Sequence, residues 1–154
     1  KQCLDNVLNL CEGRLTSMQL DLKIDGDINI FLKGRSVQIE QVLLNLIINS
    51  TQAIQNLEQK WINISIETNN NQLLIHVIDS GSGISETAEK KLMEPFYTTK
   101  AAGAGTGLGL SISLGIVQSH SGKLYLNRKF ETTCFTIELP LPESKILDHS
   151  KKVA

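Results

Sequence analysis

Amide side chains recur along one face of a long apolar segment. They stand at i, i+4, i+8 and i+11: Gln41, Asn45, Asn49 and Gln52. That spacing stacks them on one face of a helix. No charged residue occurs from 41 to 57, so we expect the helix to be largely buried. Buried amides need partners, and an amide oxygen is a suitable ligand for Mg²⁺. The pattern favours a bound ligand or ion, although periodicity alone also allows a weakly solvated stripe.

Two glycine-rich segments add a second kind of chemistry, DSGSGI at 79–84 and GAGTGLGL at 103–110. The first follows a predicted strand, so Asp79 stands at a strand end, where loops often build binding sites. The second runs into a predicted helix, whose free backbone N–H groups can face an anion. Neither is a P-loop or a GxGxxG dinucleotide fingerprint. Each alone also fits a flexible turn; beside the amide helix they indicate a phosphate site.

The elements that must position these residues follow from hydrophobic spacing. We predict helices at 1–14, 37–57, 86–93 and 107–121, and strands at 19–24, 28–32, 61–68, 72–78, 123–127 and 133–139. Residues 25–27 and 69–71 are predicted turns. Hairpins without regular strand–helix alternation predict a two-layer α/β sandwich, of the α+β type, with a mixed sheet and three main helices.

Composition narrows the class of protein. The 154 residues suit one domain, assigned to 1–142, with a polar tail at 143–154. A net charge of −1 argues against nucleic-acid binding, and no stretch is apolar enough for direct membrane insertion. Three cysteines without a CxxC pair indicate buried thiols in a reducing cytoplasm. The chain starts at Lys1 rather than Met, so we expect a fragment whose parent's membrane part, if any, lies upstream.

Four motifs in a fixed order carry a family resemblance: NLIINSTQAI, DSGSGI, EPFYTTK and GTGLGLSI. They resemble the N box, first glycine box, F box and second glycine box of sensor histidine kinases. These kinases belong to the GHKL superfamily, with DNA gyrase, the heat-shock chaperone ATPase and the mismatch-repair ATPases. The resemblance covers about residues 4–142 and looks most like the nitrogen-regulatory type. It implies a catalytic domain (HATPase_c) with the Bergerat ATP-binding fold.

The resemblance implies roles for individual residues. Asn49 matches the residue that coordinates Mg²⁺ on the ATP phosphates, and Asn45 lies one turn away toward those phosphates. Asp79 matches the acceptor of the adenine amine, and Lys100 would offset charge on the γ-phosphate. The other implied nucleotide contacts are Gly81, Gly83, Ile84, Phe96, Thr98, Thr99, Gly105, Thr106, Gly107, Leu108, Gly109, Leu110 and Thr133. Two positions depart from the family pattern: Thr132 replaces a glycine, and Gln52 stands where some relatives carry a basic residue.

The implied function is transfer of the ATP γ-phosphate to a histidine on the kinase's own dimerisation domain, which this chain lacks. A response regulator receiver domain would take the phosphate next, and the full-length parent would be a homodimer. His76, His120 and His149 lie in no HE[IL]xxP context, so none is expected to be the acceptor. The domain is expected in the cytoplasm; whether its parent is anchored in the inner membrane stays open.

Three alternatives remain at this point. A GHKL-type ATPase would carry Glu one turn before the metal-binding Asn, where this chain has Asn45, which cannot take a proton. A nucleotide-binding pseudo-kinase or docking module is disfavoured by the intact Asn49, Asp79 and second glycine box. An anti-sigma-type serine kinase fits less well than a histidine kinase because of the EPFYTTK box and the long lid.

Overall fold

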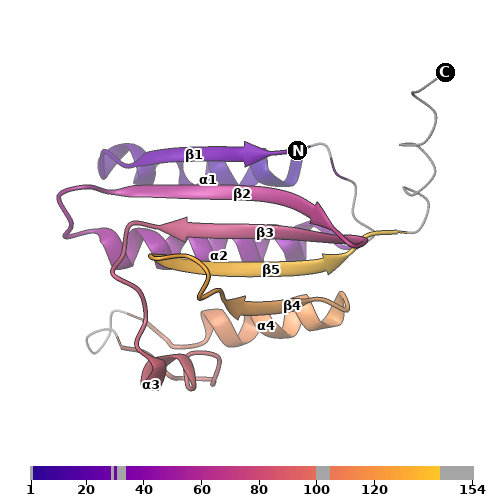
Figure 1. Cartoon of the computed structure of the whole chain (residues 1–154). Helices are drawn as coiled ribbons and strands as arrows, with labels where there is room; N and C mark the ends of the chain where they lie inside the picture. The colour runs from indigo at the N-terminus through magenta and orange to yellow at the C-terminus, as the bar shows by residue number, and fades with distance from the viewer. Residues whose placement is uncertain (1, 29, 31–33, 100–104, 143–154) are drawn as a thin grey trace.

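Within residues 2–28, 30, 34–99 and 105–142, which the computed structural model describes, five strands form one mixed sheet (Figure 1). The elements in chain order are α1 (Gln2–Ser17), β1 (Asp21–Gly26), α2 (Ser36–Ile54), β2 (Trp61–Asn69), β3 (Gln72–Asp79), α3 (Glu86–Glu89), α4 (Gly109–Ser119), β4 (Lys123–Leu126) and β5 (Thr133–Pro140). The predicted tail at 143–154 lies outside the described residues.

The strands lie in the order β1-β2-β3-β5-β4. β1 pairs in parallel with β2, and the other neighbours are antiparallel. Asn70 and Asn71 turn the β2–β3 hairpin with φ angles of 47° and 62°, which asparagine tolerates better than most residues. The predicted turn at 69–71 is therefore confirmed. The β3–β5 register sets Asp79 opposite Thr133, which brings two predicted site residues together at one end of the sheet.

Helices α1, α2 and α4 lie behind the sheet in Figure 1 and bury its core face. Each of these layers contributes side chains with no exposed surface: Val7, Leu46, Ile47, Ile64, Val77, Val117 and Ile137. Alternation along β2 turns Ile62 and Ile64 inward as predicted, while Ile66 is half-buried. The predicted two-layer α/β sandwich with a mixed sheet and three main helices is confirmed. Among the described residues, no helix combines the length and apolar character that a membrane span requires.

One predicted strand is wrong where the structure describes it. Ile28 and Ile30, from the expected strand at 28–32, lie in no strand, and the rest of that segment is outside the described residues. Both isoleucines instead pack against the core from the connection between β1 and α2. β1 thus pairs with β2, not with a hairpin partner that follows it directly. Two helices end earlier than predicted, α2 at Ile54 and α3 at Glu89, whereas α1 extends beyond its predicted end to Ser17.

The cysteines follow the prediction of unpaired, sheltered thiols. Cys11 and Cys134 are free and buried, and Cys3 is free and half-buried. Burial raises the pKa of Cys134 to about 11, so its thiol stays protonated at neutral pH. Such thiols act as small apolar groups in the core rather than as reactive sites.

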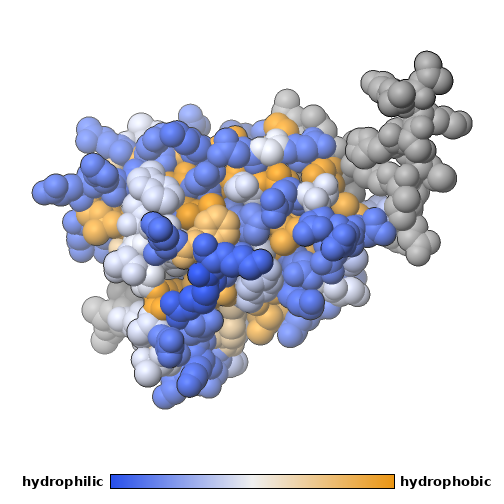
Figure 2. Space-filling view, in the orientation of Figure 1, coloured by the Kyte–Doolittle hydropathy of each residue, from blue (hydrophilic) through white to orange (hydrophobic). Residues whose placement is uncertain are grey.

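The face of the sheet opposite the helices is mainly polar. Viewed from the same side as Figure 1, hydrophilic residues spread over this face, with apolar residues in patches between them (Figure 2). His76 lies on this face, because strand alternation sends Ile75 and Val77 into the core. Its ring is nevertheless buried, and it packs on Phe130 with 5.4 Å between the ring centroids.

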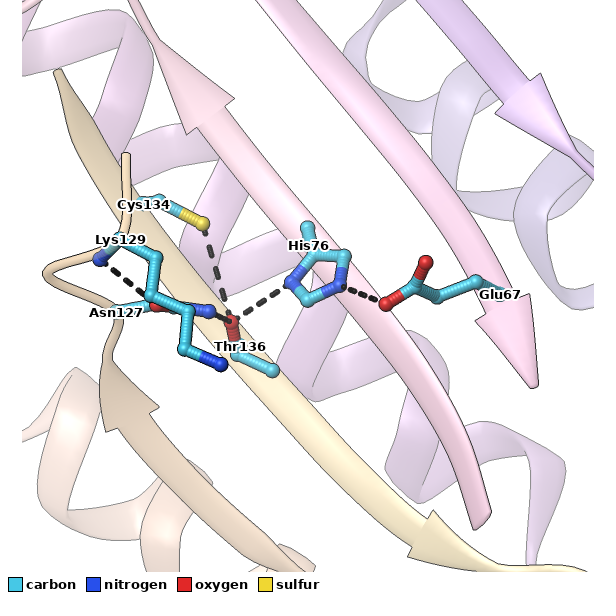
Figure 3. A network of polar contacts seen from close by, with 6 residues as sticks. All are labelled: Glu67, His76, Asn127, Lys129, Cys134 and Thr136. Carbon is cyan, nitrogen blue, oxygen red and sulfur yellow. Dashed lines mark hydrogen bonds and ion pairs between the residues drawn. The ribbon is translucent and has the colours of Figure 1, made fainter. Parts of the chain in front are cut away.

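Thr136 is the centre of a hydrogen-bond network on this face (Figure 3). Its Oγ1 lies 2.8 Å from His76 Nδ1 and accepts a hydrogen bond from Asn127 Nδ2 at 3.1 Å. His76 Nε2 lies 3.2 Å from the Glu67 carboxylate, which can only accept, so Nε2 carries the proton. Through Asn127 and His76, the network links the β4–β5 connection to β3 in the middle of the sheet.

We expect Thr136→Val to lower the free energy of unfolding by about 1–3 kcal/mol, because it leaves the buried His76 ring nitrogen and the half-buried Asn127 amide without their partner. Urea titration followed by circular dichroism measures this loss. Thr68→Val is the matched control, since Thr68 is an exposed threonine of β2 and should change stability by less than ~0.5 kcal/mol. Equal effects of the two substitutions would contradict a structural role for the network.

Candidate nucleotide site

A cavity of about 450 Å³ opens where β3 ends, between α2, the segment around α3 and the start of α4. These segments gather at one end of the molecule, at the left in Figure 1. The predicted site residues that line the cavity are Asn45, Asn49, Asp79, Gly81, Gly83, Ile84, Thr98, Thr99, Gly105, Thr106, Gly107, Gly109, Leu110 and Thr133. Residues from all four sequence motifs thus meet in one place.

Three members of the amide stripe line the cavity from α2: Asn45, Asn49 and Gln52. Gln41, two turns before Asn49, is exposed and lies outside the cavity. The rest of α2 is apolar and packs in the core, so the helix is anchored by its other face. Helical periodicity therefore predicted which side chains share a face, and the position of the cavity decides which of them line it.

Asp79 is the buried carboxyl group of the site, with 2% of its surface exposed. Burial raises its pKa, while hydrogen bonds from the Ser50 hydroxyl, the Gly81 N–H and the Thr133 hydroxyl act in the opposite direction. The Gly81 N–H donates to Asp79 Oδ1 at 2.9 Å. Since desolvation disfavours the ionised form, a ligand that donates a further hydrogen bond would stabilise the carboxylate.

Gly81 leaves room for this carboxyl group. A Cβ at Gly81 would lie 2.7 Å from Asp79 Oδ1 and 3.1 Å from Thr133 Oγ1, too close for either atom. The glycine therefore shapes the cavity wall through the absence of a side chain.

The F box and the second glycine box are joined by a backbone hydrogen bond. The Phe96 N–H donates to the Gly107 carbonyl oxygen at 3.0 Å, and both residues have a φ of 67°. A Cβ at Gly107 would collide with the Phe96 backbone, so glycine is required for space as well as for its φ. Phe96 and Gly107, from two different motifs, are thus held against each other.

The start of α4 presents backbone donors to the cavity. Gly107, Gly109 and Leu110 line it, and the first turn of α4 contains no acidic residue. The first N–H groups of a helix lack intrahelical partners and carry partial positive charge, so this end of α4 suits an anion. Leu108 occupies the N-cap position without a side-chain capping bond, and its N–H donates to Thr106 Oγ1 at 3.4 Å.

Two predicted contacts lie outside the cavity, and a third is not among the described residues. Phe96 has 75% of its surface exposed and does not line the cavity, and neither does Leu108. Lys100 lies outside the described residues. Direct nucleotide contacts by these three residues stay predictions.

Sequence reasoning missed other lining residues. They are Ile48, Ser50, Ala53, Ser82, Ala88, Leu92, Tyr97 and Phe135. Ser50 matters most, because it is buried and donates a hydrogen bond to Asp79. Its signal was a polar residue in the charge-free stretch of α2, directly after Asn49. The apolar members carry no separate signal, since a core residue and a cavity wall have the same sequence pattern.

The donor set fits a metal ion held together with a phosphate ligand. No group of three or more His, Cys, Asp or Glu side chains is placed to bind a metal among the described residues. Asn45 and Asn49 offer neutral amide oxygens instead, one helical turn apart. Mg²⁺ is commonly bound by few protein ligands, with phosphate oxygens and water completing its shell. The residues present therefore fit Mg²⁺ that arrives with a nucleotide.

Comparison with known proteins identifies related sequences. A family model described as histidine kinase-, DNA gyrase B-, and HSP90-like ATPase matches residues 34–143. Sporulation kinase B of Bacillus subtilis is 32% identical over 125 residues, which is 80% of this chain and 28% of that protein. Sensor protein TdiS of Thauera aromatica is 36% identical over 110 residues, 68% of this chain and 20% of that protein. This chain thus spans less than a third of these curated relatives.

Solved structures of histidine kinases share its fold. The nucleotide-free catalytic domain of histidine kinase ThkA superposes with a TM-score of 0.79 and 30% identity, covering 92% of this chain and 94% of that domain. ThkA in complex with the response regulator protein TrrA gives a TM-score of 0.77 and 27% identity, covering 94% of this chain and 41% of that chain. The chain therefore belongs to the histidine kinase-, DNA gyrase B- and HSP90-like ATPase family, as a catalytic domain of the histidine kinase type.

Proposed function

We propose that this chain binds ATP with Mg²⁺ and donates the γ-phosphate to a histidine on the dimerisation domain of the same kinase. One observation carries the proposal: a single cavity is lined by a buried carboxyl group, by two amides of α2 and by the start of α4. ATP needs all three kinds of partner at the same time. Its base offers a hydrogen-bond donor, which the carboxyl group can accept, and its phosphates need the amides and the helix start.

Asp79 would recognise the base. Its carboxyl group already accepts hydrogen bonds from three protein donors and retains acceptor capacity, since an ionised carboxylate offers about four lone-pair sites. The exocyclic amine of adenine is a donor, whereas guanine presents an oxygen at that position. A buried acceptor therefore favours adenine, because an unpaired polar group in this place costs free energy.

Asn49 and the start of α4 would hold the phosphates. The amide oxygen of Asn49 is the proposed protein ligand of Mg²⁺, and the Asn45 side chain lies one turn away. When bound, Mg²⁺ would neutralise part of the phosphate charge and orient the γ-phosphate. The N–H groups at the start of α4 supply further positive potential. Lys100, outside the described residues, is proposed to add charge beside the γ-phosphate.

In the proposed reaction a neutral imidazole nitrogen attacks the γ-phosphorus. The new N–P bond forms as the bond between the γ-phosphorus and the β,γ-bridging oxygen breaks, which releases ADP. Phosphoryl transfer depends mainly on positioning and charge neutralisation. Asn45, one turn before the proposed metal ligand, cannot take a proton from water, which favours transfer over hydrolysis.

The described histidines of this chain are unsuited as acceptors. His76 is buried on the sheet face that points away from the helices. His120 engages both ring nitrogens: Nδ1 lies 2.9 Å from the Ile116 carbonyl oxygen, and Nε2 accepts the Arg35 N–H at 3.3 Å. His149 lies outside the described residues. An acceptor on a separate dimerisation domain is consistent with these placements.

We also propose the partners of the parent protein. Because the related ThkA forms a complex with a response regulator, the phosphate is proposed to pass to a receiver domain of a response regulator. The parent would act as a homodimer through its dimerisation domain. We propose a cytoplasmic position for this domain, whether or not the parent is anchored in the inner membrane.

We predict that Asn49 is required for binding of Mg-ATP. Asn49→Ala should abolish Mg²⁺-dependent ATP binding and leave the fold intact, because Asn49 is half-buried at the cavity and not in the core. Calorimetric titration with ATP, with and without Mg²⁺, measures this. Gln41→Ala is the matched control, an exposed amide on the same helix. Unchanged affinity of Asn49→Ala for Mg-ATP would remove Asn49 from the metal site.

We predict that loss of the Asp79 charge affects ATP binding and the stability of the fold in different ways. Asp79→Asn should weaken ATP binding by about 1.5–3 kcal/mol, the value of a hydrogen bond to a charged group. The raised folded-state pKa of Asp79 means that its contribution to stability is lost as pH rises through that pKa. The unliganded variant should therefore be at least as stable as the parent at pH 7, with any advantage shrinking near pH 4.

Urea unfolding at the two pH values and ATP titration at pH 7 test both parts. Asp25→Asn, an exposed aspartate of β1, serves as the control. If Asp79→Asn bound ATP as the parent does, the adenine would have to lie elsewhere.

We predict that phosphoryl transfer requires the dimerisation domain. The isolated chain should bind ATP but neither phosphorylate itself nor hydrolyse ATP quickly. Addition of the dimerisation domain of its parent should produce an acid-labile phosphate on a histidine of that domain, detected with γ-labelled ATP. Rapid hydrolysis by the chain alone would favour the ATPase alternative, and labelled serine on an added protein would favour the serine kinase.

A further inference from the structure

Ser113 is a buried polar residue of α4 that the proposed reaction does not use. It is 1% exposed, and its Oγ accepts a hydrogen bond from Asn45 Nδ2 of α2 at 3.0 Å. Two other serines of α4, Ser111 and Ser119, donate to carbonyl oxygens of their own helix at 2.9 and 2.7 Å. That is the usual partner of a helical serine. Ser113 instead links two helices.

This hydrogen bond orients the Asn45 amide. An amide carries two donors on nitrogen and two acceptor sites on oxygen, so the partner of one end decides where the other end lies. With Nδ2 on Ser113, Oδ1 lies against Gly109, where a Cβ would collide with it. Asn45 and Gly109 both line the cavity, so this contact between α2 and α4 lies at the proposed phosphate site.

The Asn45 side chain is therefore held between the two elements that must act together on the phosphates. One turn further along α2 is Asn49, the proposed metal ligand. On the other side is the first turn of α4, with the N–H groups proposed to face the phosphates. A shift of either helix would stretch the Asn45–Ser113 contact, since it spans them directly.

We propose that Ser113 is a positioning residue of the phosphate site. It acts through Asn45, whose amide it holds with the oxygen against Gly109, and so sets the spacing between the metal-binding turn of α2 and the start of α4. This inference rests on the proposed ATP-binding function, and it concerns the phosphate and metal part of the ligand rather than the base.

The base part of the site, at Asp79, does not depend on Ser113. Asp79 lies at the end of β3 and is held by Ser50, Gly81 and Thr133, with no contact to Ser113 among its hydrogen bonds. Loss of the Ser113 hydroxyl should therefore affect ligands with phosphates and spare the base. A general loosening of the fold would weaken both kinds of ligand alike.

The experiment titrates the chain with Mg-ATP and with adenosine, which presents the base without phosphates. Ser113→Ala should raise the Kd of Mg-ATP about tenfold, the effect of losing one buried hydrogen bond, and leave the Kd of adenosine within about twofold. Ser119→Ala, on the same helix, should change neither value. Equal weakening of both ligands, or an unchanged Kd for Mg-ATP, would overturn the proposal.

A double-mutant cycle tests whether Ser113 acts through Asn45. Asn45→Ala breaks the same contact from the other side and should also weaken Mg-ATP selectively. In that background Ser113→Ala should have little further effect, because coupled residues are non-additive. A full tenfold loss in the Asn45→Ala background would overturn the proposed route. A parent chain that binds adenosine but not Mg-ATP, or neither, would instead contradict the proposed function itself.

Discussion

The site depends on burying one carboxyl group, Asp79, among hydrogen-bond donors of the protein. Asp79 lies at the end of β3, and the register of β3 with β5 sets Thr133 opposite it. Ser50 reaches it from α2, and the Gly81 N–H reaches it from the following loop. Burial of a carboxylate is unfavourable unless donors surround it. The sheet, α2 and the first glycine box must therefore all be correctly placed for Asp79 to be buried.

The same packing explains why the phosphate part of the site lies beside the base part. α2 supplies Ser50 to the carboxyl group and Asn49 to the proposed metal, because adjacent residues of a helix face different directions. α4 packs against α2 and brings its N-terminal turn to the same cavity. The Asn45–Ser113 hydrogen bond fixes that packing at the point where the phosphates are proposed to lie.

The two faces of the sheet have different roles. The core face carries the helices and thus the cavity, while the other face holds its buried polar groups in a network centred on Thr136. β5 belongs to both, since Thr133 lines the cavity and Thr136 lies three residues further along the same strand. Stability of the sheet and geometry of the site are therefore linked through one strand.

The sequence by itself determined the elements and much of the site. Periodicity located α2 and its amide face, alternation located β2 and β3, and four motifs indicated a nucleotide site. These signals are local, because helix and strand periods depend on residues a few positions apart. The family resemblance then connected the motifs to one another.

Only the tertiary structure decided which polar residues meet. The parallel pairing of β1 with β2, the absence of a strand at Ile28 and Ile30, and the exposure of Phe96 depend on contacts distant in sequence. Ser50 stood out only as a polar residue in a charge-free helix and Ser113 carried no distinctive pattern, since a serine in a buried helix gives no indication of its partner. Their partners, Asp79 and Asn45, lie 29 and 68 residues away, and only the packing of α2, α4 and β3 against one another brings these side chains within hydrogen-bond distance.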